Sequence, residues 1–123
     1  MNRLVSESLD SFVRNQDPVK SLGLGYEGKI RNFFRGFNIP DKDYEVKEDG
    51  EIAFNISLDL ENTQISELPD NLTINGYLNL ENTQIRELPD NLTVKDNIYV
   101  NKYQTELIDF IQNSKFKNKL IIE

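Results

Sequence analysis

The side chains that most often carry chemistry are missing from this chain or stand in an unsuitable context. The 123 residues include no His and no Cys, which removes the usual general base near neutral pH and the thiolate nucleophile. The stretch GLGYEG, Gly23 to Gly28, has the glycine spacing of a dinucleotide-binding loop, and Asp43 and Glu45 follow it. A Pro-containing segment precedes it where that loop needs a strand, so we interpret it as a turn before a helix.

The acidic residues give no better candidate for a reaction or a metal. The stretch DKDYEVKEDG has the acids of a calcium loop, but Val46 stands where an EF-hand loop needs Gly. Glu61 and Glu81 could form a carboxylate pair for acid–base catalysis. They occupy equivalent positions of two repeats, however, and repetition accounts for the pair without catalysis. We therefore expect no enzymatic activity, no metal and no cofactor.

A twenty-residue repeat dominates the middle of the chain. The letters LENTQI occur at 60–65 and again at 80–85, and residues 58–77 match residues 78–97 at fourteen of twenty positions. A fixed period of this length is typical of solenoids. Within each repeat, LDL or LNL alternates as a strand does, and ELPDN indicates a turn. We expect one short strand per repeat, then a bend and an irregular return.

The repeat resembles a leucine-rich repeat of the short bacterial kind, L-x-L-x-x-N-x-L-x-x-L-P. The frame positions filled in the two copies are Leu58, Leu60, Ile65, Leu68 and Pro69, and Leu78, Leu80, Ile85, Leu88 and Pro89. Thr63 and Thr83 replace the usual Asn, and we expect their hydroxyls to bind backbone groups in the bend. This Thr variant is similar to small leucine-rich-repeat-like proteins of tailed bacteriophages and their hosts, which implies a phage-encoded protein.

Two and a half repeats cannot bury their own ends, and the flanking segments supply cover. Before the repeats, an apolar helix face precedes Pro40, and Asp49-Gly50 indicates a hairpin. After the repeats, Thr105 can begin a second helix, and KLIIE can form a last strand. The predicted fold is α+β: a short leucine-rich-repeat-like parallel β-solenoid with helical caps at both ends and an N-terminal β-hairpin. We expect one folding unit, with a cap over 1–50, the repeats over 51–104 and a cap over 105–123.

The first sixteen residues form an amphipathic stretch, and two interpretations stay open. The stretch can dock on the domain as part of the cap. It can also act as a detachable address, similar to the N-terminal helices that mark proteins for packaging into phage capsids.

Charge and hydropathy limit the partners. The net charge is −7, and residues 51–104 carry nine acids against three bases, so we expect no binding to nucleic acid or to an anionic membrane. The sequence shows no secretory signal and no apolar run long enough to span a bilayer. We expect a cytoplasmic protein with a protein partner, in an oligomeric state that the sequence leaves open.

The residues between the leucines should form the binding face, as in leucine-rich repeats. We expect the rings of Tyr77 and Tyr99 to meet diagonally, because the two positions differ by two residues once the period is removed. Acceptor side chains would surround them as an acidic rim with few cations. The predicted partner-binding residues are Asp59, Tyr77, Asn79, Glu81, Tyr99 and Asn101.

These features predict a non-enzymatic protein–protein interaction module. The alternative function is a structural or capsid cargo protein of a virion, addressed by its N-terminal helix.

Overall fold

A computed structural model describes residues 25–123. Both interpretations of residues 1–16, and the start of the GLGYEG stretch, lie outside the described residues. With η for a 3₁₀ helix, the elements in chain order are α2 (Glu27–Arg35), η2 (Asp41–Asp43), β1 (Tyr44–Val46), β2 (Ile52–Phe54), β3 (Leu58–Asp59), β4 (Leu72–Ile74), β5 (Leu78–Asn79), β6 (Thr93–Val94), β7 (Ile98–Val100), α3 (Thr105–Gln112), η3 (Lys117–Lys119) and β8 (Leu120–Ile122). Within the described range, no helix has the length and apolar character needed to cross a membrane.

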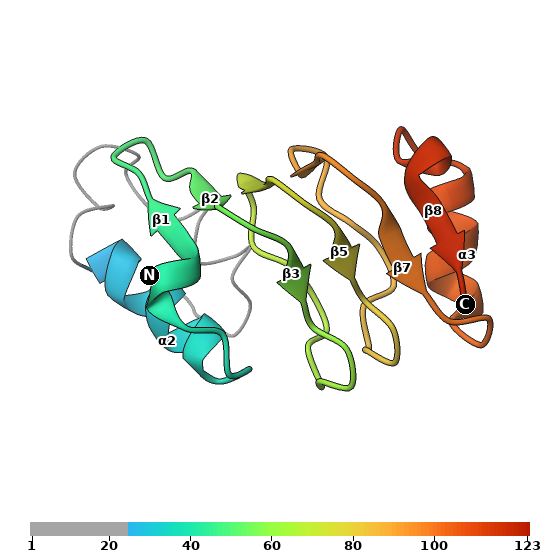
Figure 1. The fold of residues 1–123 in the computed structure, drawn as a ribbon, viewed down its shortest axis with the longest axis horizontal. Coiled ribbons are helices and arrows are strands. Elements are labelled where there is room, and N and C mark those ends of the chain that lie inside the picture. The colour runs from blue at the N-terminus through green and yellow to red at the C-terminus, as the bar shows by residue number, and fades with distance from the viewer. Residues whose placement is uncertain (1–24) are drawn as a thin grey trace, which may run out of the picture.

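The strands form two four-stranded sheets (Figure 1). Sheet A has the order β1-β2-β4-β6 and sheet B the order β3-β5-β7-β8. The repeats pair in parallel at an offset of twenty residues in both sheets: Ile52 lies opposite Leu72 in sheet A, and Leu58 lies opposite Leu78 in sheet B. The sequence period is therefore the hydrogen-bonding register of the fold.

The expected architecture of a helix-capped solenoid with one strand per repeat was wrong. Each repeat contributes one strand to each of two sheets, and sheet A is mixed because β1 joins it antiparallel. Neither helix is a terminal cap, because α2 leads into η2 and β1, and α3 is followed by η3 and by β8, the edge strand of sheet B. The described residues form an α+β fold of two helices, one mixed sheet and one parallel sheet.

The strand that we missed has a simple pattern. Leu72-Thr73-Ile74 alternates buried and half-buried side chains, as a strand facing a core does. It directly follows the Pro-Asp-Asn turn, and the turn signal led us to expect an irregular return. A three-residue strand is too short to give a periodicity that outweighs such a signal.

The expected hairpin is confirmed by the antiparallel pairing of β1 with β2 around Gly50, whose φ is 93°. Helix α2 buries Ile30 and Phe34, as its apolar spacing predicted. Thr105 does not cap α3, because Gln104 precedes the helix and forms no side-chain cap hydrogen bond.

The core between the sheets is a stack of aliphatic side chains. Leu58, Leu78 and Ile98 lie in register and are at most 1% exposed. Among residues 25–123, no polar or charged residue is buried.

The bends between the sheets are stabilised by hydrogen bonds that repeat from coil to coil. The hydroxyl of Thr63 donates to Leu60 O at 2.8 Å, and that of Thr83 donates to Leu80 O at 2.9 Å. This confirms the expected role of the two threonines. Asn62 and Asn82 have φ values of 64° and 57°, a left-handed conformation that Asn tolerates, and their carboxamides form a 2.7 Å hydrogen bond to each other.

Leu78→Asp should unfold the repeats. The substitution places a carboxylate at a position that is 0% exposed, with no cation beside it in the apolar stack. Hydrogen exchange should show the amides of β3, β5 and β7 exchanging without protection.

The matched control is Asp59→Ala. Asp59 lies next to the same register position but faces solvent, and its carboxylate accepts one hydrogen bond, from Glu61 N at 3.0 Å. We expect a loss of less than about 1 kcal/mol in the free energy of unfolding. Protected amides in Leu78→Asp, or a loss above about 3 kcal/mol in Asp59→Ala, would mean that the strand faces are assigned the wrong way round.

Candidate interaction surface

The exposed face of sheet B holds the predicted binding residues. The pairing of β3, β5, β7 and β8 aligns Asp59, Asn79, Tyr99 and Ile121 in one row across the sheet. Ile121 is 36% exposed and was missing from the predicted set. It lies twenty-two residues after Tyr99, so the period of twenty gave no signal for it.

Tyr77 and Tyr99 form an aromatic pair on this face, as expected. Their ring centroids are 5.6 Å apart and the planes meet at 88°, an edge-to-face contact. Tyr77 keeps 38% of its surface exposed.

The backbone before Tyr77 is fixed by the preceding repeat. The hydroxyl of Ser57 accepts a hydrogen bond from Tyr77 N at 2.9 Å. A Cβ on Gly76 would lie 2.3 Å from that hydroxyl, so Gly at position 76 allows the two coils to approach. The backbone at Tyr77 is therefore held against the preceding coil at Ser57.

The other predicted residues already take part in local hydrogen bonds. The side-chain oxygen of Asn79 accepts from Glu81 N at 2.9 Å, and that of Asn101 accepts from Tyr103 N at 3.0 Å. These contacts shape the chain as it leaves β5 and β7. Asn79 and Asn101 thus position their neighbours as well as lining the face.

Carboxylates gather where the strands of sheet B end. We define the acidic band as Glu61, Glu81 and Glu123, which follow β3, β5 and β8. Partial burial raises the pKa of Glu81, and the nearby charges of Glu61, Glu123 and Asp59 raise it further. The band therefore gathers three carboxylates at one end of sheet B.

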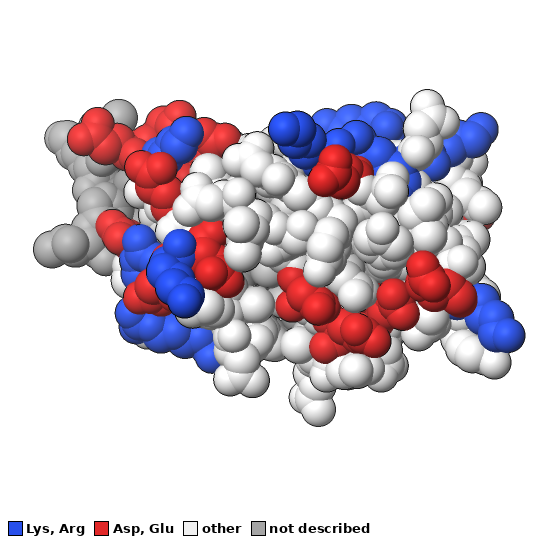
Figure 2. Space-filling model, in the orientation of Figure 1, with Lys and Arg blue, Asp and Glu red and all other residues white. Residues whose placement is uncertain are grey.

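Lysines gather at the opposite end of the same strands, which corrects the expected rim of acid with few cations. We define the basic band as Lys95, Lys117 and Lys119, which precede β7 and β8, and Lys119 Nζ lies 3.2 Å from Lys95 O. Figure 2 shows basic side chains along the upper edge of this face and acidic ones along the lower edge. Two of these lysines belong to the segment after the repeats, whose position the period could not predict.

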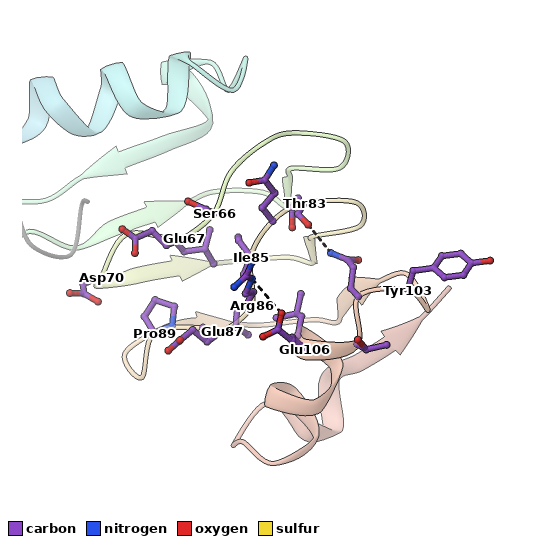
Figure 3. Close-up of a pocket in the computed structure, with 16 residues that line it drawn as sticks. Ser66, Glu67, Asp70, Thr83, Ile85, Arg86, Glu87, Pro89, Tyr103 and Glu106 are labelled. Carbon is purple, nitrogen blue, oxygen red and sulfur yellow. Dashed lines mark hydrogen bonds and ion pairs between the residues drawn. The ribbon is translucent and has the colours of Figure 1, made fainter. Parts of the chain in front are cut away.

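A groove lies away from this face, between the bends of the repeats and the start of α3 (Figure 3). Its volume is about 640 Å³. Arg86 and Glu106 point toward each other across it and form an ion pair at 3.4 Å, with both side chains more than 70% exposed. The groove was not predicted from the sequence. The available signal was Arg86, which stands where the preceding repeat has Ser66, in stretches that otherwise match.

Gln104 holds α3 against the repeats beside the groove. Its side-chain nitrogen donates to Leu80 O at 2.8 Å, and its side-chain oxygen accepts from Asn101 N at 2.8 Å. The remaining charged residues in the lining are Glu67, Asp70 and Glu87. Among the described residues, no group of three or more potential ligands could hold a metal ion.

Comparison of the chain with protein families, characterised proteins and solved structures finds no match.

Glu81→Gln should stabilise the protein at pH 7 and leave it unchanged near pH 3. A raised pKa means that the folded protein binds this proton more tightly than the unfolded chain does. The contribution of Glu81 to stability therefore falls as pH rises from the ordinary value toward the raised pKa. Because solvent screens this half-buried carboxylate, the gain should stay below about 0.5 kcal/mol, measured by denaturant unfolding at both pH values.

Glu87→Gln is the matched control, because it removes the same charge outside the acidic band. If both variants gain equally at pH 7, the effect comes from net charge and not from the band.

Proposed function

We propose that this protein is a non-enzymatic interaction module that binds a protein partner through the exposed face of sheet B. The observation that carries the proposal is the edge-to-face contact between the exposed Tyr77 and the half-buried Tyr99 on the outer face of sheet B. Tyr is enriched at interface hot spots, since its ring gives a large rigid contact at low entropic cost.

The rest of the face supports protein recognition. Ile121 extends the apolar contact along the row of Tyr99, and the two charged bands border it. Apolar centres with charged rims are the usual anatomy of protein interfaces. The partner should present acids opposite Lys95 and Lys119 and bases opposite Glu81 and Glu123, because complementary potentials select partners and orient them.

The sequence supports the same proposal on catalysis, on origin and on the class of partner. The absence of His and Cys from the sequence argues against catalysis. The similarity of the Thr variant of the repeat to small leucine-rich-repeat-like proteins of tailed bacteriophages and their hosts supports a phage-encoded protein. The resemblance to leucine-rich repeats supports binding through the strand face, because such repeats usually bind partners there. The net charge of −7 supports a protein partner over nucleic acid, and we place the protein in the cytoplasm of the bacterial host.

Tyr77→Ala combined with Tyr99→Ala should keep the fold and weaken partner binding. Both rings lie outside the buried core, so thermal unfolding should change little. Proteins retained from a bacterial host lysate by the wild type should be lost with the double variant. Calorimetric titration of a recovered partner should show at least a tenfold loss of affinity, about 1.4 kcal/mol.

Tyr103→Ala is the control. Tyr103 is the most exposed tyrosine of the described residues, at 79%. It lies in the loop after β7, at the margin of the groove and outside the row on sheet B. It should retain the partner. Equal binding by wild type and the folded double variant would remove the sheet B face as the binding site.

A further inference from the structure

The two charged bands give the face of sheet B a polarity along its strands. The basic band lies where β7 and β8 begin, and the acidic band lies where β3, β5 and β8 end. Two residues depart from this division: Asp96 lies within the basic band, and Lys102 follows β7 at the acidic end, 5.4 Å from the ring of Tyr103. The basic end still carries a net positive charge and the acidic end a net negative one.

A surface with this polarity is complementary to itself under one symmetry operation. A two-fold axis that lies in the face and crosses the strands reverses the strand direction and keeps each strand opposite its own copy. Because each strand lies opposite its own copy, Lys117 and Lys119 before β8 face Glu123 of the other molecule. Lys95, before β7, faces the end of β7 between Glu81 and Glu123, and Glu61 has no lysine opposite it. An axis along the strands would instead place like charges together.

We propose that the partner of this face is a second copy of the chain, packed face to face about the two-fold axis that crosses the strands. The inference rests on the proposed function, since it uses the same face, and it names the partner. Two copies related in this way form a closed dimer, because each face is fully used by the other.

The centre of the face suits this arrangement. Tyr99 and Ile121 lie in the same row across the sheet, so an axis along that row brings both near the same residues of the second copy. Stacked sheets lie about 10 Å apart, a spacing that side chains from both faces fill. The ring of Tyr99 would then meet the ring of Tyr99 of the second copy, while Tyr77, two positions before Asn79, would face Glu81 of the second copy.

The contact area indicates a weak dimer. Four strands span about 19 Å at 4.8 Å each, and the five positions 57–61 span about 16 Å, giving a planar area of roughly 300 Å² per copy. Standard interfaces bury about 800 Å² per partner. Asp59 also weakens the contact, because the axis brings it toward the same residue of the second copy. Self-association should therefore appear only at high protein concentration.

Charge exchange between the bands provides the test. The basic-band variant carries Lys95→Glu and Lys119→Glu, and the acidic-band variant carries Glu81→Lys and Glu123→Lys. Alone, each variant opposes like charges across the axis, and its association constant should fall at least tenfold below wild type. An equimolar mixture opposes unlike charges at both ends of the face and should restore association to the wild-type level. Sedimentation equilibrium up to about 1 mM protein measures all four samples against the 14.3 kDa monomer.

If net charge alone controlled association, the acidic-band variant would associate more strongly than wild type and not more weakly. The acidic-band variant has a net charge of −7 + 4 = −3, so general repulsion alone would make it associate more strongly than wild type. The control Glu48→Lys with Glu87→Lys reaches the same −3 at two exposed positions outside the bands. It should associate at least as strongly as wild type, while the acidic-band variant should not. Circular dichroism and thermal unfolding verify that every variant is folded.

A monomeric wild type at 1 mM, or a mixture that stays monomeric, would overturn the inference. Undiminished dimerisation by the folded Tyr77→Ala, Tyr99→Ala variant would also overturn it, because the contact would then lie elsewhere. If the wild type is monomeric and binds a lysate protein that the tyrosine variant does not bind, this inference fails and the proposed function stands. If the wild type is monomeric and the tyrosine variant binds the lysate protein with unchanged affinity, both the inference and the proposed function fail.

Discussion

The parallel register between successive repeats is the constraint on which the other features depend. Leu58, Leu78 and Ile98 can stack in the core only if each strand pairs at an offset of twenty residues. A shift by one residue would turn the leucines to solvent and bring the polar positions between them inside. The same register aligns the threonine hydroxyls and the asparagine carboxamides of the bends, so the polar contacts reinforce the apolar ones.

The outer face of sheet B follows from this register. The residues between the core leucines must face outward, and pairing at a fixed offset turns them into rows. Asp59 and Asn79 occupy one row in neighbouring repeats, and the exchange of a carboxylate for a carboxamide lowers the charge at the centre of the face. At the end of the strands Glu61 and Glu81 are both retained, and the pKa of Glu81 is raised by its partial burial first and by the nearby charge of Glu61 second.

The features that the sequence predicts correctly are those set by the twenty-residue period. The strand LDL, its register with LNL and the meeting of the two tyrosine rings all follow from a repeat of twenty and an alternation of two. The second sheet could not be predicted in this way, because Leu72 to Ile74 is only three residues long and directly follows a turn signal. The lysines at 117 and 119 come from a segment outside the repeats. The expected last strand in KLIIE is confirmed by the pairing of β8 with β7, which fixes the position of these lysines. The groove beside Arg86 likewise depends on how α3 packs, which no local pattern encodes.

Gln104 has a consequence for how a chain of this kind can change in length. Its carboxamide binds the carbonyl of Leu80, which also accepts a hydrogen bond from Thr83, and so ties the incoming helix to the last full bend. Another coil placed directly after this bend would compete with Gln104 and α3 for the same surface. A twenty-residue unit duplicated in frame between positions 77 and 78 would meet a leucine strand on either side and leave Gln104 in place. Growth of the array in evolution should therefore proceed from its interior, with the segment after Val100 inherited unchanged as a terminator.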